Sequence, residues 1–119
     1  MYATFLNQSS LYAKAGAALA AGCTIVIKPA EDTPLVALAL VNLADQAGFP
    51  KGVINIVTAA HKNASEVGKA MCESRDVGVM SFTGSSRVGK ILYRQCAGTV
   101  KKLALELGGD APFIGKLTF

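Results

Sequence analysis

Short apolar runs alternate along the chain with longer stretches in which apolar residues recur at helical spacing. The runs are rich in isoleucine, valine and leucine and carry few polar positions, which is typical of strands buried on both faces of a parallel sheet. They predict strands over residues 24–28, 53–57, 77–83 and 101–107. The intervening stretches predict helices over residues 11–21, from Pro34 up to Gly48, over residues 63–72 and over residues 86–97.

The second of these helices has the clearest boundaries in the sequence. Thr33 stands at the N-cap position, Pro34 at the first helical position, and Gly48 with Pro50 ends the helix. Strands and helices that alternate at this spacing form βαβ units, whose right-handed crossovers build an open parallel sheet. The sequence therefore predicts an α/β fold with a Rossmann-like open parallel sheet and helices on both faces.

Composition and charge narrow the classes of protein that this fold can represent. The 119 residues allow one domain or part of one, and a hydrophobic fraction of 51% with 17% charged residues argues against disorder. The net charge of +4 comes from the second half of the chain, where Arg87, Lys90 and Arg94 share one face of a predicted helix. Tyr93 is the one aromatic residue among these charges, so a stacking surface for nucleic acid is not indicated and a solvated helix face is expected.

Neither a membrane span nor a metal site is indicated by the sequence. The longest charge-free apolar run, between Lys14 and Lys28, is shorter than the roughly 20 residues that span a bilayer. It imitates a signal peptide, but it continues into a predicted strand instead of a cleavage site. Cys23, Cys72 and Cys96 are widely spaced, which favours small core residues over disulfides or zinc ligands. A reducing intracellular compartment, the cytoplasm or the mitochondrial matrix, is expected.

Two places in the predicted sheet could hold a ligand. Ligands of parallel sheets bind at the carboxyl ends of the strands, where helix N-termini present unpaired N–H groups. This rule selects the segment Lys28–Glu31 and the turn Phe82–Lys90. The turn matches the first seven positions of a Walker A phosphate loop, but Ile91 replaces the serine or threonine that would hold magnesium. The residues alone therefore indicate either a phosphate-facing corner or an ordinary glycine-containing turn.

Three motifs acquire meaning from their order in the chain: Lys-Pro-Ala-Glu at 28–31, Phe-Thr-Gly-Ser at 82–85 with Gly89, and Leu-Glu-Leu-Gly-Gly at 105–109. Together they resemble the coenzyme-binding domain of the aldehyde dehydrogenase superfamily, and the resemblance extends over residues 14–114. Within the superfamily, the segments 17–23, 31–34 and 106–114 are most similar to succinate-semialdehyde dehydrogenases.

The resemblance implies an oxidoreductase that oxidises an aldehyde, succinate semialdehyde, with NAD, whereas NADP is the less expected coenzyme. Lys28 and Glu31 match residues that bind the adenosine ribose hydroxyls, and Glu106 matches the general base that activates the hydrolytic water. The residues that match the loop and helix start facing the pyrophosphate and adenine are Gly84, Ser85, Ser86, Val88 and Gly89. The implied partners are a small-molecule aldehyde and a dinucleotide, without metal, nucleic acid or membrane, and full-length relatives are expected to be homo-oligomers.

The sequence also departs from the family pattern. Residues 1–13 do not resemble the corresponding family segment, and Ala13 stands where related succinate-semialdehyde enzymes have an arginine for the substrate carboxylate. Residues 115–119 leave the pattern as well. We therefore expect a divergent segment over 1–13, a partial NAD-binding domain over 14–114, incomplete relative to the full family domain, and a divergent tail over 115–119. The family's nucleophilic cysteine lies beyond Phe119, so this chain by itself is expected to be inactive.

Two other functions remain open at this point. A non-catalytic module that binds a dinucleotide or another subunit would carry the same three motifs. A P-loop-like nucleotide binder would use the turn after the third predicted strand, but Ile91 argues against it.

Overall fold

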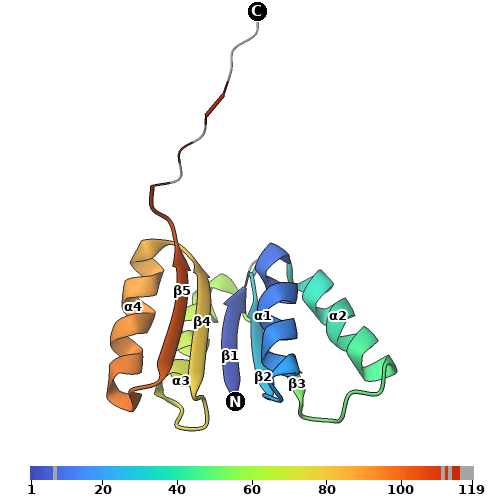
Figure 1. The fold of residues 1–119 in the computed structure, drawn as a ribbon. Helices are drawn as coiled ribbons and strands as arrows, with labels where there is room; N and C mark the ends of the chain where they lie inside the picture. Colours follow the sequence, from blue (N-terminus) through green and yellow to red (C-terminus); the bar gives the residue numbers. More distant parts are fainter. Residues whose placement is uncertain (7, 111, 113, 116–119) are drawn as a thin grey trace, which may run out of the picture.

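Five parallel strands form one sheet in the order β3-β2-β1-β4-β5 in the computed structural model, which describes residues 1–6, 8–110, 112, 114 and 115 (Figure 1). The strands are β1 (Tyr2–Leu6), β2 (Ile25–Pro29), β3 (Ile54–Ile56), β4 (Val79–Gly84) and β5 (Lys102–Leu107). Four of them coincide with the strands predicted from the apolar runs. The Rossmann-like open parallel sheet is thereby confirmed.

The hydrophobic pattern does not predict β1, although this strand lies at the centre of the sheet. Ala3 pairs with Val26 of β2 on one side and with Met80 of β4 on the other. Ala3 and Thr4 are both fully buried. Residues at the start of the chain thus supply the strand that joins the two halves of the sheet.

The helices cover both faces of the sheet, as predicted. The helices α1 (Gln8–Ala20) and α2 (Pro34–Gln46) lie on one face, and α3 (Ala64–Glu73) and α4 (Ser86–Cys96) lie on the other (Figure 1). Two short 3₁₀ turns, η1 (His61–Asn63) and η2 (Ala97–Thr99), precede α3 and follow α4. The predicted start of α2 is confirmed, with Thr33 at the N-cap and Pro34 in the first turn, although the Thr33 side chain makes no capping hydrogen bond.

A separate apolar core fills the space on each side of the sheet. Ile25 and Ile27 of β2 point toward α1 and α2, where they pack against alanines of both helices. Met80 and Phe82 of β4 point the other way, into a cluster that includes Cys72 of α3. The two faces are used by alternate residues of the same strands, because successive strand side chains point in opposite directions.

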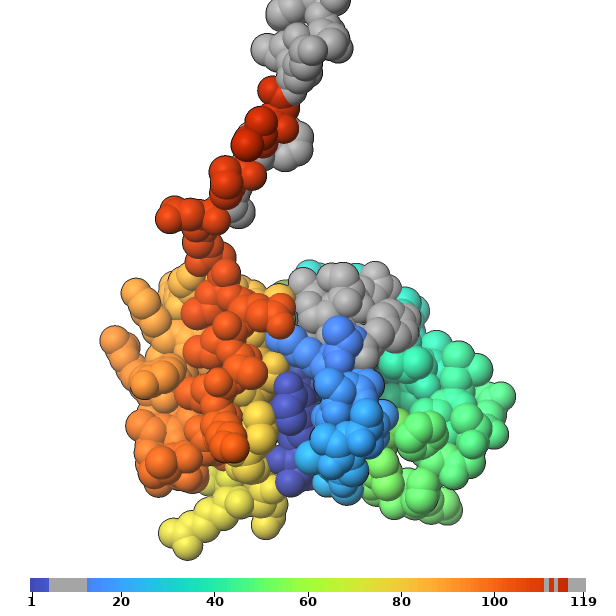
Figure 2. Space-filling view, viewed as in Figure 1, coloured from blue at the N-terminus to red at the C-terminus, as the bar shows by residue number. Residues whose placement is uncertain are grey.

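The face that carries α1 and α2 is covered over half of the sheet only. Figure 2 shows atoms of β4 and β5 at the surface beside α1. Along β5 the exposed residues Lys102, Ala104 and Glu106 alternate with the half-buried Leu103 and Leu105. Glu106 therefore lies on the open half of this face, near the carboxyl end of β5.

Among the described residues, no helix has the length and the apolar character that a membrane crossing requires. The motif at 105–109 lies within the described chain, whereas Ala111 and Phe113 of its continuation lie outside the described residues. Residues 116–119 of the expected tail also lie outside them.

Candidate functional site

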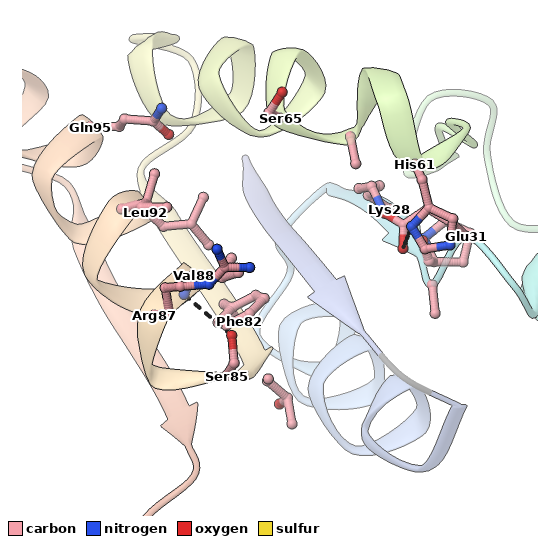
Figure 3. Close-up of a pocket in the computed structure, with 16 residues that line it drawn as sticks. Lys28, Glu31, His61, Ser65, Phe82, Ser85, Arg87, Val88, Leu92 and Gln95 are labelled. Atoms are coloured by element: carbon pink, nitrogen blue, oxygen red, sulfur yellow. Dashed lines mark hydrogen bonds and ion pairs between the residues drawn. The ribbon is translucent and has the colours of Figure 1, made fainter.

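A pocket of about 550 Å³ opens at the carboxyl ends of β2 and β4, on the two sides of the central strand β1 (Figure 3). The strand order reverses at β1, and the crevice at such a reversal is where open parallel sheets bind ligands. The residues that line the pocket come from β2 and the turn after it, from η1 and α3, and from β4 and α4. They are Lys28, Pro29, Ala30, Glu31, His61, Ala64, Ser65, Phe82, Thr83, Gly84, Ser85, Arg87, Val88, Ile91, Leu92 and Gln95.

Lys28 and Glu31 form the polar wall of the pocket. The Lys28 side chain is buried at the end of β2, and its ammonium group donates hydrogen bonds to the carbonyl oxygen of Pro29, at 3.0 Å, and to the Glu31 carboxylate. Burial raises the pKa of Glu31, whereas the Lys28 hydrogen bond, a bond from its own backbone and the charges of Lys28 and His61 lower it. The net direction is down, so the carboxylate is ionised and able to accept further hydrogen bonds.

The opposite wall is the N-terminus of α4. Ser85 is the N-cap residue, and its hydroxyl oxygen accepts a hydrogen bond from the Val88 backbone N–H at 3.3 Å. The Gly89 N–H donates to the Ser85 carbonyl oxygen at 3.0 Å, which is the first hydrogen bond of the helix. A helix N-terminus carries partial positive charge, and the pocket side of this one attracts anions such as phosphate.

Neighbouring side chains lie close to the two glycines of this corner. A Cβ atom at Gly84 would lie 2.5 Å from the Phe82 ring, and one at Gly89 would lie 2.5 Å from the Leu107 side chain. Gly89 is buried inside α4 and does not line the pocket. Because its N–H already bonds within the helix, it cannot wrap a phosphate as the second glycine of a Walker A loop does. The P-loop-like hypothesis is therefore not supported.

Ser86 lies outside the lining of the pocket, whereas Ile91 belongs to it. Ser86 does not line the pocket, and its hydroxyl donates to the carbonyl oxygen of Gly108 at 2.8 Å, which ties the start of α4 to the end of β5. Ile91, a residue of a type usually buried, is 46% exposed and forms part of the pocket wall.

Glu106 lies next to the pocket and not in its lining. Its carboxylate accepts a hydrogen bond from the Thr83 hydroxyl at 3.3 Å, and it forms an ion pair with Lys14 at 3.1 Å. Lys14 also donates to the Thr83 hydroxyl oxygen at 2.7 Å. Thr83 lines the pocket, so this network of three side chains connects Glu106 to it, while 64% of the Glu106 side chain stays exposed to water.

Sequence reasoning did not identify Lys14 or His61 as site residues. Lys14 is a single charge within an apolar helix, and its side chain is 90% buried against β4 and β5, with 10% exposed. His61 is the one histidine of the sequence, and it lies on the rim of the pocket. The sequence offered one indication for each residue: Lys14 is a lone charge in an apolar segment, and His61 is the single histidine.

The cysteines divide into two groups. Cys72 and Cys96 are buried, as expected, and the hydroxyl of Thr99 donates to the carbonyl oxygens of both. Burial, with the neighbouring Cys96, raises the pKa of the Cys72 thiol to about 12. The expectation for Cys23 was wrong: this residue is exposed, because it lies in the turn that Gly22, with its positive φ of 74°, makes between α1 and β2.

None of these thiols belongs to the pocket. Cys23 precedes β2 and so lies at the amino edge of the sheet, opposite the carboxyl edge where the pocket opens. In the part of the chain that the structure describes, no group of three or more metal-ligating side chains is assembled.

Comparison with known proteins identifies the family. The model of the aldehyde dehydrogenase family matches residues 8–115. The mitochondrial succinate-semialdehyde dehydrogenase of Homo sapiens is 59% identical over 101 residues, which are 85% of this chain and 19% of that protein. The NADP(+) succinate-semialdehyde dehydrogenase of Saccharomyces cerevisiae is 57% identical over 101 residues, 85% of this chain and 20% of that protein.

A solved structure agrees with these relatives. The crystal structure of succinate-semialdehyde dehydrogenase from Burkholderia pseudomallei has a TM-score of 0.88 and 46% sequence identity, and the match covers 97% of this chain and 24% of that one. The chain thus spans about a fifth of the length of the curated relatives that it matches. The family model, however, covers most of this chain. The chain belongs to the aldehyde dehydrogenase family.

Proposed function

We propose that this chain is the coenzyme-binding part of an NAD-dependent aldehyde dehydrogenase that oxidises succinate semialdehyde to succinate. The family is NAD(P)-dependent. The observation that carries the proposal is the pairing of Lys28 and Glu31 across the pocket from the N-terminus of α4. This arrangement offers a carboxylate for hydroxyl groups on one wall and a positive helix end for phosphate on the other.

The chemistry of the pocket walls fits a dinucleotide. Glu31 keeps acceptor sites beyond the one that Lys28 occupies, because an ionised carboxylate has about four lone-pair sites for the two ribose hydroxyls. Ser85 and the first turn of α4 would meet the pyrophosphate, and Val88 with Phe82 supplies apolar surface for the adenine. Gly84, Ser86 and Gly89 shape this corner through their contacts with Phe82, Gly108 and Leu107 respectively.

Glu106 is the proposed general base. Bound NAD would accept a hydride from the aldehyde carbon. Glu106 would take a proton from the water that releases the acid, and its exposure leaves a carboxylate oxygen accessible to that water. Lys14 and Thr83 hold the carboxylate in position through the ion pair and the hydrogen bond described above.

Catalysis needs a thiolate that this chain does not place in the site. Cys72 and Cys96 are buried and Cys23 lies at the opposite edge of the sheet, so no thiol can reach an aldehyde in the pocket. We therefore propose that the chain binds the coenzyme without oxidising the aldehyde by itself. Residues 14–114 would form the partial NAD-binding domain, with divergent segments over 1–13 and 115–119, in a protein of a reducing compartment.

Titration of the full chain with NAD by isothermal calorimetry tests the proposal. We expect NAD to bind, and we expect Glu31→Gln to weaken binding by about tenfold, since a hydrogen bond to a charged group is worth about 1.5–3 kcal/mol when buried. Asp45→Asn is the matched control, because it removes one exposed carboxylate of α2 that does not line the pocket. A folded chain that binds no NAD, or binds it equally well after Glu31→Gln, would contradict the proposal.

An assay of NADH formation with succinate semialdehyde tests whether the chain oxidises the aldehyde by itself. We expect no turnover from the chain alone. Turnover that survives replacement of all three cysteines would show a different mechanism, and turnover that one replacement abolishes would show that the nucleophile has been misplaced.

A further inference from the structure

His61 stands at the start of η1 between the two carboxylates that follow β2. Its Nε2 atom is 3.0 Å from Asp32 Oδ1, and its Nδ1 atom is 3.9 Å from Glu31 Oε2. Figure 3 shows His61 beside Glu31 and Lys28, on the wall of the pocket opposite Val88 and Ser85. The imidazole is therefore next to the carboxylate proposed for the ribose hydroxyls.

The charges around His61 come from several elements. Lys28 of β2 is paired with Glu31, so Asp32 adds one negative charge that Lys28 does not balance. Lys62 lies on the same element as His61, Glu66 on α3, and Arg87 lines the far side of the pocket on α4.

His61 supplies the one imidazole group of the chain. Lysine, arginine and carboxylate side chains titrate outside the range from about pH 5 to pH 8, and imidazole titrates inside it. The amino-terminal group of Met1 precedes β1 and lies at the opposite edge of the sheet. The balance of charge beside Glu31 therefore changes with the protonation of His61, the one histidine of the chain.

We propose that His61 makes the choice between NAD and NADP depend on pH. With a neutral imidazole, Lys28 balances one of the two carboxylates, Glu31 and Asp32, and the other repels a 2′-phosphate placed beside them. With an imidazolium, a positive charge lies beside both carboxylates and weakens this repulsion. The inference rests on the proposed function, because it requires the adenosine ribose to lie next to Glu31.

Calorimetric titration of the full chain with NAD and with NADP, at about pH 6 and about pH 8, tests this role. The measured quantity is the ratio of the NADP affinity to the NAD affinity. We expect this ratio to rise on acidification about threefold to fivefold more in the wild type than in His61→Gln, as an exposed charge pair allows. His61 is 72% exposed, so its substitution does not disturb the core.

Two further variants complete the design. His61→Lys keeps a positive charge at both pH values, and we expect its ratio to be high at both. Lys62→Gln removes the neighbouring exposed charge on the same element, and we expect it to leave the pH dependence unchanged. His61→Gln also corrects for the 2′-phosphate, which itself titrates near pH 6 as phosphate monoesters do and affects all variants equally.

The outcomes separate this inference from the proposed function. If both coenzymes bind and the ratio follows the same pH profile in the wild type and in His61→Gln, the role of His61 is refuted while coenzyme binding stands. If neither coenzyme binds to the folded chain, the proposed function itself fails.

Discussion

At the scale of single residues, the site depends on one buried lysine. Lys28 is 4% exposed, yet its ammonium group is satisfied by groups of its own turn, the Pro29 carbonyl and the Glu31 carboxylate. A buried charge without such partners would cost several kcal/mol. Glu31 therefore serves the fold as well as the proposed ligand, because it neutralises a cation that β2 carries into the interior.

The lowered pKa of Glu31 makes its contribution to stability depend on pH. A carboxyl whose folded-state pKa is lowered stabilises the fold above its unfolded value of 4.5, and this contribution is lost as the pH falls through the lower native value. We expect Glu31→Gln to reduce the free energy of unfolding by about 1–2 kcal/mol at neutral pH, and to have a smaller effect near pH 3. Urea unfolding at both pH values measures this, and an equal effect at both would contradict it.

Lys14 provides a second test at this scale. Its long side chain is 10% exposed, but its partner Glu106 is largely in water, so the ion pair is screened. We expect Lys14→Met, which keeps most of the apolar stem, to lower the free energy of unfolding by only about 1 kcal/mol, mainly through the lost bond to Thr83. Thr83→Val should then cost less in the Lys14→Met background than in the wild type. Strictly additive effects in this double-mutant cycle would show that the contact is not formed.

At the scale of elements, α4 and β5 approach each other closely at one point. A Cβ atom at Gly89 would lie 2.5 Å from Leu107 Cδ2 and 2.9 Å from Cδ1. In α1, by contrast, no described atom lies within 4 Å of the Cβ position of Gly16. The two glycines share a helical setting but differ in their surroundings.

This contrast predicts opposite effects of the same substitution. We expect Gly16→Ala to raise the free energy of unfolding by about 0.5–1 kcal/mol, because alanine favours a helix. We expect Gly89→Ala to lower it by about 1 kcal/mol, since the cost of overpacking, about 1–3 kcal/mol, exceeds the helix gain. Thermal unfolding gives both values, with Leu107→Ala as the relief variant: Gly89→Ala should become harmless in that background. Destabilisation that persists there would place the clash elsewhere.

The four strands that the sequence predicts differ from the missed strand β1 in the residues that they bury. Consecutive β-branched residues predict buried strands such as Ile25–Pro29. In the central strand Tyr2–Leu6, Ala3 and Thr4 are fully buried, and these small residues fit because neighbouring strands enclose this strand on both sides. Its position was set by pairing with β2 and β4, which are distant in sequence and leave no local pattern.

The same distinction applies to the site. Lys28, Glu31, Gly84, Ser85 and Val88 were identified from motifs, and the structure brings them to one pocket. Lys14 reaches Glu106 only because α1 packs on the central strands β1 and β2, and His61 reaches Glu31 only because η1 returns to the end of β2. Contacts between separate segments of this kind are produced by the tertiary fold, and a single sequence does not show them.

At the scale of the whole molecule, one face of the sheet is covered by helices and the other is partly open to solvent. The face under α3 and α4 buries a continuous apolar core that includes Cys72 and Cys96. On the other face, α1 and α2 pack over β1 to β3, whereas atoms of β4 and β5 lie at the surface (Figure 2). Glu106 of β5 is exposed on this open part. The proposed base thus remains in contact with solvent while the strands that position it are held rigidly from behind.

Because α3 and α4 cover one face of the sheet, the reactivity of the cysteines shows whether that face is closed in the folded chain. The thiolate is the reactive form, and the Cys72 pKa near 12 together with burial keeps that thiol protonated and out of reach, whereas Cys23 is exposed. We expect a disulfide reagent at about pH 8 to modify Cys23 rapidly in the native chain and Cys72 and Cys96 only after unfolding in denaturant. Cys23→Ser is the control and should abolish the fast phase.

The raised pKa of the Cys72 thiol adds a pH dependence. A raised thiol pKa stabilises the fold below the unfolded value of 9.0, and this contribution is lost as the pH rises toward about 12. The buried thiols should therefore become reactive as alkaline pH opens the core. Rapid modification of all three cysteines at pH 8 in a folded chain would show that α3 and α4 do not close this face of the sheet.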